Sequence, residues 1–184
     1  MPDGQSCGET TPDPGSPAAL SVDIAQQDVA WDEAGEALPA LIERAVAAAL
    51  DAAGARVPQA SALEVSVVLA GDDFVHDLNR RYRGKDKATN ILSFPSGLAV
   101  PEGDGAFGLG DLVLAFETVN GEARTLSKPL DQHVAHLIAH GTLHLVGYTH
   151  EGDEDGDVMV AAERAALAAL GFGDPYAGLE GAAA

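Results

Sequence analysis

The sequence predicts a single α+β domain in which about five helices pack on a small mixed β-sheet. Two observations support this fold class. Apolar residues make up 46% of the 184 residues, which is enough for one hydrophobic core. Segments that suit β-strands also alternate along the chain with segments of helical periodicity. We expect the domain to span residues 19–174, between a disordered N-terminal tail (1–18) rich in Pro, Gly, Ser and Asp and a frayed C-terminal tail (175–184).

The first half of the domain contains two predicted strands and two predicted helices. Residues 20–24 alternate apolar and polar side chains, as a half-buried strand does. Residues 37–53 place five apolar side chains on one helical face, and Gly54 is suited to end that helix. Residues 63–70 predict a second strand, and residues 72–81 a short helix that begins at an aspartate.

The second half supplies two further strands and two further helices. Residues 89–94 predict a strand that ends before a proline, and residues 111–116 predict another. The glycine-rich segment 97–110 between them is expected to be a mobile loop. A helix is expected from about 127 to 146 and a last one from about 154 to 170, each followed by a glycine. The predicted order is strand, helix, strand, helix, strand, strand, helix, helix.

The charge of the chain is strongly acidic but unevenly distributed. The net charge is −19, which argues against general nucleic-acid binding because phosphates require basic side chains. Half of the ten Lys and Arg residues nevertheless lie in one short stretch: Arg80, Arg81, Arg83, Lys85 and Lys87. This stretch is interpreted either as a solvated loop or as a local anion site on an acidic body.

Other features of composition bear on where the protein works. The only cysteine, Cys7, excludes an internal disulfide and a cysteine-based zinc finger. The first residues lack the basic start and apolar run of a secretory signal, and no apolar stretch approaches the roughly 18 residues of a membrane span. We therefore expect a cytoplasmic protein that does not associate with membranes.

Three histidines at and just beyond the end of the third predicted helix, residues 127–146, indicate a metal site. His140 and His144 are four residues apart, so both imidazoles can reach one ion at roughly 2.0–2.1 Å. Gly147 can end the helix and turn the chain back, which brings His150 to the same ion. The spacing H-x3-H-x2-G-x2-H is the one that supplies three zinc ligands in metzincin proteases. Three nitrogen donors leave the fourth position open, as in catalytic zinc sites, so we expect one Zn²⁺ per chain.

The neighbouring residues limit the chemistry of this site. His136 also precedes His140 by four, but three successive helical turns would spread the outer ligands by more than about 10 Å. His133 and His136 are therefore assigned to packing or to contacts with the ligands. Zinc peptidases of this type carry a glutamate directly after the first histidine as general base, and this chain has Gly141 there.

Three segments of the chain resemble the YbeY family of bacterial endoribonucleases. HGTLHLVGYTH is similar to that family's HGxLHLxGYDH, LNRRYRGKDKATNILSFP to LNxxYRGKDKPTDVLSFP, and GLGDLVLAFETV to a strand in which Asp111 is in place. The resemblance implies zinc ligation by His140, His144 and His150, and a functional Arg83 that faces RNA. It also implies cleavage of single-stranded RNA, maturation of the 3′ end of 16S ribosomal RNA and a part in ribosome quality control. Thr149 departs from the pattern, because the family has Asp there.

Three functional hypotheses follow from these observations. The first is a zinc-dependent, single-strand-specific endoribonuclease whose partners are ribosomal RNA and the small ribosomal subunit, with no DNA and no membrane. The second is a zinc peptidase or other amide hydrolase that uses the same histidine triad, which Gly141 disfavours. The third is a ribosome assembly factor without catalytic activity, in which zinc only stabilises the fold.

Overall fold

The computed structural model describes residues 18–97, 106–150 and 152–177. The two predicted tails, residues 1–18 and 175–184, lie largely outside these ranges, and Cys7 lies wholly outside them. No helix among the described residues is long and apolar enough to cross a membrane.

The centre of the domain is a four-stranded mixed sheet. Its strands are β1 (Ala19–Gln26), β2 (Ala62–Ala70), β3 (Ile91–Pro95) and β4 (Ala106–Ala115), in the order β1-β2-β4-β3. The first three in this order run parallel, and β3 runs antiparallel to β4 at the edge. The small mixed sheet predicted from the sequence is therefore confirmed.

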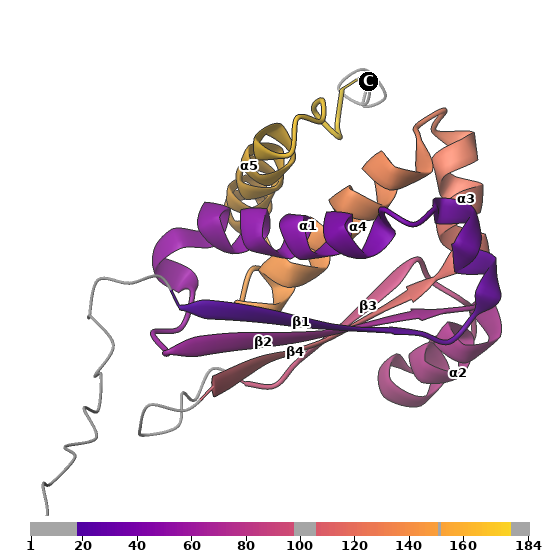
Figure 1. Ribbon diagram of the computed structural model, residues 1–184, viewed down its shortest axis with the longest axis horizontal. Helices are drawn as coiled ribbons and strands as arrows, with labels where there is room; N and C mark the ends of the chain where they lie inside the picture. The colour runs from indigo at the N-terminus through magenta and orange to yellow at the C-terminus, as the bar shows by residue number, and fades with distance from the viewer. Residues whose placement is uncertain (1–17, 98–105, 151, 178–184) are drawn as a thin grey trace, which may run out of the picture.

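Helices cover both faces of this sheet (Figure 1). The helices are α1 (Leu38–Ala53), α2 (Asp72–Arg83), α3 (Phe116–Thr125), α4 (Leu130–Leu145) and α5 (Asp153–Ala169), with short 3-10 turns η1 (Val29–Ala34) and η2 (Gly54–Arg56). Figure 1 shows α1, α4 and α5 over one face, and α2 against the other. This arrangement is the α+β class that the sequence predicts.

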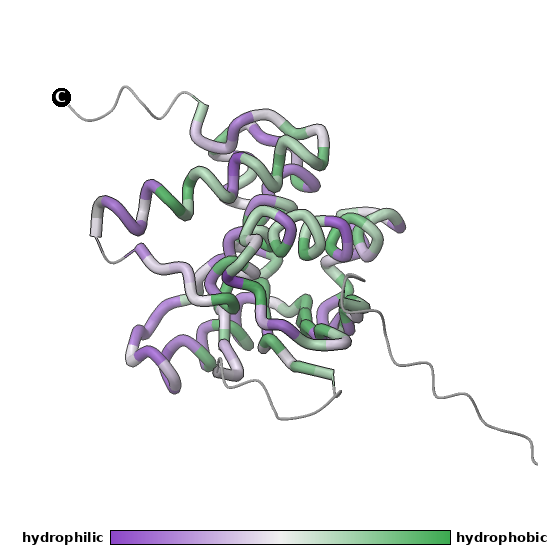
Figure 2. The backbone as a smooth tube through the Cα atoms, turned by 90° about the vertical axis from the view of Figure 1, so that its left-hand side faces the viewer, coloured by the Kyte–Doolittle hydropathy of each residue, from purple (hydrophilic) through white to green (hydrophobic). Residues whose placement is uncertain are grey.

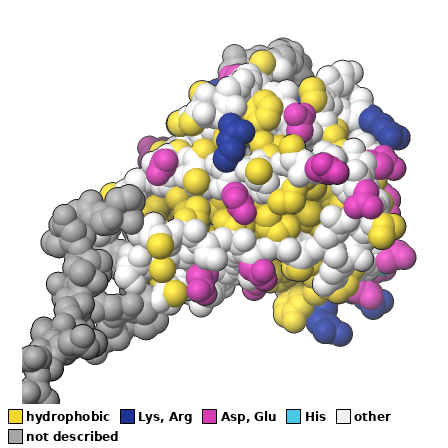
Figure 3. Space-filling model, in the orientation of Figure 1, with side chains coloured by type: hydrophobic (Ala, Val, Ile, Leu, Met, Phe, Trp, Pro, Cys, Tyr) yellow, Lys and Arg dark blue, Asp and Glu magenta, His cyan; other side chains and the backbone are white. Residues whose placement is uncertain are grey.

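The two faces bury cores of different size. The larger core lies between the sheet and the helices α1 and α4, where Ile42, Val67, Leu112 and Ile138 have no exposed surface. The smaller core lies under α2, around Val75. Figure 2 shows hydrophobic positions concentrated where these elements meet in the interior. The face drawn in Figure 3 carries scattered carboxylates, in keeping with the acidic composition.

One predicted loop is partly a strand. The segment 97–110 was expected to be a loop, but β4 begins at Ala106; residues 98–105 are outside the described part of the chain. Phe107 and Leu109 are buried, and the positions that alternate with them are glycines, which conceal the pattern of a strand. At Gly110, with φ of 136°, a β-carbon would lie 2.2 Å from the carbonyl oxygen of Phe94. Only glycine permits this close approach of β3.

One helix of the structure has no counterpart in the sequence pattern. The segment Phe116–Thr125 forms α3, where the pattern predicted the end of a strand and then no regular structure. Its sequence, FETVNGEART, contains Val, Asn, Gly and Thr, all weak helix formers. Tertiary packing overrides that weakness, because Phe116, Val119 and Ala123 are all buried in the domain.

Candidate metal centre

The structure brings the three predicted metal ligands together at the C-terminal end of α4. His140 and His144 lie on one face of that helix, and Gly147, with φ of 87°, turns the chain so that His150 returns beside them. The rings of His140 and His150 stack with centroids 5.1 Å apart. One nitrogen of each histidine lies within 4.8 Å of the others, so the cluster could hold a metal ion.

Hydrogen bonds fix which nitrogen of each helical histidine is available. His144 Nδ1 lies 2.8 Å from the carbonyl oxygen of Tyr148. A carbonyl can only accept, so Nδ1 carries the proton and Nε2 keeps its lone pair. Burial, and next the neighbouring His140, lower the pKa of His144, which favours the neutral form that binds metals.

The separation of the two nitrogens fits a single ion. Nε2 of His140 and Nε2 of His144 are 3.1 Å apart. Two nitrogens bound at the usual zinc distance in a tetrahedral site lie about 3.3 Å apart. The donor set, the tautomer of His144 and this spacing therefore suit one tetrahedral metal ion with three imidazole ligands.

A buried carboxylate behind the histidines was not predicted from the sequence. Glu163 of α5 has no exposed surface, and its Oε1 lies 2.7 Å from Nδ1 of His140. Its other oxygen contacts His136 at 3.4 Å and accepts a hydrogen bond from the hydroxyl of Tyr176. Burial by itself would raise the pKa of Glu163, but these hydrogen bonds outweigh it and hold the pKa well below its usual range. The carboxylate is thus charged and oriented to accept the Nδ1 proton of His140.

A signal for Glu163 was present in the pattern of α5. The residue lies on the helical face that also buries Met159, Ala162, Ala166 and Leu167. A single charged residue on an otherwise apolar face is seldom buried without a partner. The sequence could therefore indicate that Glu163 has a buried partner, but not that this partner is His140.

The two remaining histidines of α4 contact acidic residues. His136 reaches Glu163, as described above. His133 is buried, and its Nε2 lies 2.9 Å from Glu122 of α3, which also accepts hydrogen bonds from the amide of Asn90. Burial lowers the pKa of His133, and the contact with Glu122 opposes this shift without reversing it. Neither histidine belongs to the described cluster of His140, His144 and His150, and their supporting role stays a prediction.

Arg83 lines the same cleft as the three histidines. The cleft has a volume of about 880 Å³ and is lined by residues of α2, β3, α4 and the turn after α4, among them Tyr82, Arg83, Asn90, Phe94, His140, His144, Thr149 and His150. Of the five residues in the basic stretch, Arg83 lines the cleft, and Arg80 instead donates to Asp77 at 3.0 Å. The structure therefore brings one arginine, rather than a cluster of cations, to the candidate metal site.

A backbone turn sets the position of Arg83. Gly84 follows it in the left-handed conformation, with φ of 66°, and ends α2. The N–H groups of Gly84 and Lys85 both donate to the carbonyl oxygen of Asn79. The buried side chain of Asn79 donates in turn to the carbonyl oxygen of Lys87 at 2.7 Å. These bonds tie the loop after α2 to the helix itself.

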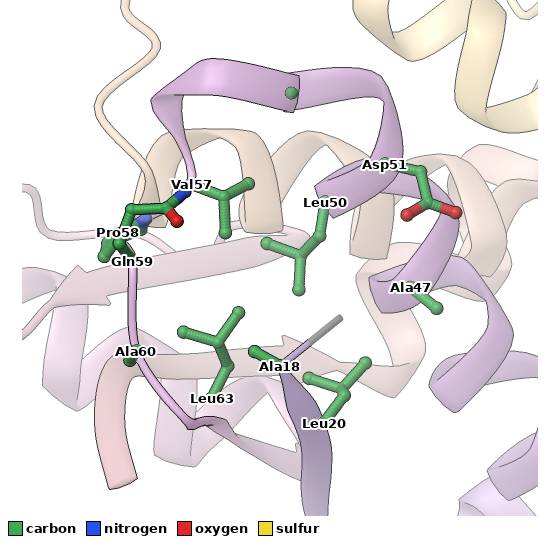
Figure 4. Close-up of a pocket in the computed structure, with 11 residues that line it drawn as sticks. Ala18, Leu20, Ala47, Leu50, Asp51, Val57, Pro58, Gln59, Ala60 and Leu63 are labelled. Atoms are coloured by element: carbon green, nitrogen blue, oxygen red, sulfur yellow. The ribbon is translucent and has the colours of Figure 1, made fainter. Parts of the chain in front are cut away.

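A smaller cavity adjoins the metal site on its other side. It has a volume of about 330 Å³, and Lys128, His133, His136 and Tyr176 are among the residues that line it. Asn90, Ile91, His140 and His150 line both this cavity and the larger cleft, so the candidate metal site lies where the two meet. A third cavity of about 430 Å³, lined mainly by apolar residues such as Leu20, Leu50 and Leu63 (Figure 4), shares no lining residue with either.

Gly141 faces the sheet and leaves no room for a side chain. A β-carbon at this position would lie 2.8 Å from Ile91 Cδ1, 2.8 Å from Leu112 Cδ2 and 3.1 Å from Ser93 Oγ. Zinc peptidases of the related spacing carry their glutamate base at this position. The packing of α4 on β3 and β4 therefore excludes that base, which weakens the peptidase hypothesis.

Comparison with known proteins extends the resemblance to the YbeY family over most of the chain. The model of the family described as "Endoribonuclease YbeY" matches residues 26–171. A protein of that name from Methylocella silvestris is 46% identical over 157 residues, which cover 84% of this chain and 85% of the relative. Another from Rhodopseudomonas palustris is 49% identical over 140 residues, covering 76% of this chain and 72% of the relative. A solution structure from Thermotoga maritima shares the fold, with a TM-score of 0.50 and 21% identity over 82% of this chain and 91% of that one.

Proposed function

Since the chain belongs to the YbeY family of endoribonucleases, it is a hydrolase of RNA phosphodiester bonds, and we propose that it is zinc-dependent and specific for single strands. The observation that carries the proposal is the shared cleft. The three clustered imidazoles and Arg83 line this one cleft, which supports a joint role for them in binding and cleaving RNA.

The proposed metal ligands are His140, His144 and His150, with one Zn²⁺ per chain. Imidazole donors suit zinc, and three of them leave a coordination position for water or substrate. Zinc in such a site acts as a Lewis acid on a phosphoryl oxygen and lowers the pKa of a bound water. Glu163 keeps His140 oriented, and the carbonyl of Tyr148 does the same for His144.

Arg83 is the proposed catalytic residue. Hydrolysis of a phosphodiester passes through a state in which negative charge builds up on the phosphoryl oxygens. A planar guanidinium can hold two of these oxygens at once and neutralise part of that charge. The adjacent 2′-hydroxyl of RNA can also serve as nucleophile: its oxygen bonds to phosphorus and its proton passes to solvent, while the 5′-oxygen leaves and takes up a proton. Water then opens the resulting cyclic phosphate, so a glutamate at the position of Gly141 is not needed to supply the nucleophile.

The proposed substrate is the 3′ end of 16S ribosomal RNA, and the proposed setting is the small ribosomal subunit in the cytoplasm, including its quality control. Membership of the family supports this substrate. The acidic body of the protein, with its net charge of −19, supports a selective rather than general affinity for RNA.

A cleavage assay with metal control tests the proposal. Purified protein is given an end-labelled RNA that spans the 3′ end of 16S RNA, either single-stranded or annealed to its complement. We expect cleavage of the single strand, loss of cleavage after chelation and recovery when zinc is added back. Elemental analysis should find about one zinc per chain.

The same assay separates the remaining hypotheses. Full zinc content without cleavage of either RNA would favour an assembly factor with a structural metal. Hydrolysis of casein that stops on chelation would favour a peptidase. Equal cleavage of single and double strands would overturn the proposed strand specificity.

A further inference from the structure

We propose that Tyr82 is a stacking platform for one base of the bound RNA strand, next to the phosphate that is cleaved. This inference rests on the proposed function, and it adds a binding residue and a physical basis for the choice of single strands.

The first observation is the exposure of Tyr82 inside the cleft. The residue is 62% exposed, although large aromatic side chains gain much from burial. It lines the same cleft as Arg83 and the three histidines. Tyr82 and Arg83 are consecutive at the end of α2, so a strand whose phosphate contacts Arg83 has its neighbouring bases within reach of the tyrosine ring.

The second observation is that the exposed ring is held in place. Tyr82 meets Phe94 of β3 edge to face, with ring centroids 5.4 Å apart and an angle of 71° between the rings. Phe94 packs in turn on the smaller core under α2, which contains Val75, Leu92 and Val113. A ring that is already oriented loses little conformational freedom when a base stacks on it.

The charge of the cleft gives the third argument. Among the five residues of the basic stretch only Arg83 lines it, on a body whose net charge is −19. Each neutralised phosphate contributes about −0.7 to the slope of log K against log salt for single strands. Contact of one phosphate with Arg83 alone therefore predicts a slope of about −0.7, too small for this side chain's charge to supply most of the affinity. Stacking can supply the remainder, because it does not depend on counterion release.

The chemistry of stacking also accounts for strand choice. Every base has a π-face, so an aromatic platform accepts bases with little regard to sequence. In a duplex, those faces are covered by neighbouring base pairs and cannot reach the ring. Tyr82 would thus favour unpaired RNA without reading a particular base.

An abasic scan tests the proposal. Binding of the zinc-loaded protein is measured with a set of 2′-O-methyl RNA oligonucleotides of about eight nucleotides, each with one base removed at a different position. Gel analysis confirms that they stay intact. At one position we expect base removal to weaken binding to the parent by roughly 5- to 150-fold, the range found for single stacked bases. Tyr82→Leu should bind the oligonucleotides that keep this base more weakly than the parent does, and removal of the base should not weaken its binding further.

Two further variants control this experiment. Tyr82→Phe keeps the ring and should bind like the parent with the same abasic profile. Phe74→Leu removes another exposed aromatic residue of α2, 43% exposed and outside the lining of the cleft, and should also match the parent. Melting temperatures confirm folding, and the exposure of Tyr82 predicts a small change.

The outcomes separate this proposal from the proposed function. A flat abasic profile, or the same position-dependent loss in the parent and in Tyr82→Leu, would overturn stacking even if the protein cleaves RNA normally. A profile that depends on Tyr82, without any cleavage of unmodified RNA by the zinc-loaded protein, would support stacking and overturn the proposed zinc-dependent cleavage of single strands. Absence of RNA binding by the parent would overturn stacking.

Discussion

The two walls of the cleft are ordered by different means. On the wall that carries the three histidines (the metal wall), hydrogen bonds hold the ligand side chains: fully buried Glu163 contacts His140, and the backbone carbonyl of Tyr148 accepts from His144. On the wall formed by the end of α2 (the exposed wall), Tyr82 and Arg83 are exposed, and the backbone turn at Gly84 ends the helix directly after them. Hydrogen bonds to charged groups are stronger in a buried environment and costly to leave unmade. Substitutions on the metal wall should therefore disturb the position of the metal ligands, whereas substitutions on the exposed wall should leave the metal ligands and the fold unchanged.

Removal of a ligand should have the largest effect. His144→Ala should lose the metal, because two imidazoles hold zinc far more weakly than three. His133→Ala, which changes a buried histidine of the same helix that is not a proposed ligand, should keep it. Elemental analysis of both purified variants measures the difference. A full complement of zinc in His144→Ala would show that the ligand assignment is wrong.

Glu163→Gln tests whether the metal wall acts through its buried carboxylate. The change keeps the size of the side chain but removes the charge that holds the proton on Nδ1 of His140. We expect zinc affinity to fall by about 10- to 100-fold, the usual effect of losing such a partner. Competition with a chelator measures it, and Tyr176→Phe, which leaves the carboxylate in place, should lose less. Unchanged affinity in Glu163→Gln, with the variant folded, would contradict the supporting role of this carboxylate.

Arg83→Ala tests the exposed wall. We expect the rate of RNA cleavage to fall by about a hundredfold or more, with zinc content and melting temperature unchanged. Arg83→Lys should recover part of the rate, because it keeps the charge but not the planar pair of donors. Lys87→Ala is the matched control from the same basic stretch, since its side chain does not line the cleft. Equal rates for Arg83→Ala and Lys87→Ala would remove Arg83 from the proposed mechanism.

The smallest effect is expected at Thr149, where the metal wall reaches the surface. Thr149 is exposed, lines the cleft and directly precedes His150. Thr149→Asp introduces the residue of the family pattern, and a carboxylate beside a ligand can raise its basicity and fix its orientation. We expect equal or slightly tighter zinc binding in a chelator titration. Clearly weaker retention of zinc would show that the added carboxylate does not assist His150.

The sequence predicted those parts of the molecule that depend on local pattern. The spacing of His140, His144 and His150 around Gly147 was sufficient to bring the three together, because one helix and one turn determine their geometry. Most helices and strands were predicted for the same reason. The helix α3 was missed because packing, not propensity, stabilises it.

Contacts between distant segments could not be derived from local pattern. The contact of His140 with Glu163 joins two helices, and nothing in the spacing of either helix determines how they cross. The presence of Arg83 in the same cleft as the histidines likewise depends on how α2 packs on the sheet. Family resemblance indicated Arg83, whereas charge alone left it among five equivalent cations.

The crowding around Gly141 limits how this scaffold could evolve. A glutamate at that position, the simplest genetic route toward peptidase chemistry, would collide with Ile91 and Leu112. Relief of the collision would require smaller residues at both positions, and each such change in a core costs about 1–5 kcal/mol. Intermediates would lose stability before they gained an activity, so selection would remove them. The layer of apolar contacts beneath α4 thus acts as an evolutionary barrier between two hydrolase classes that share one histidine spacing.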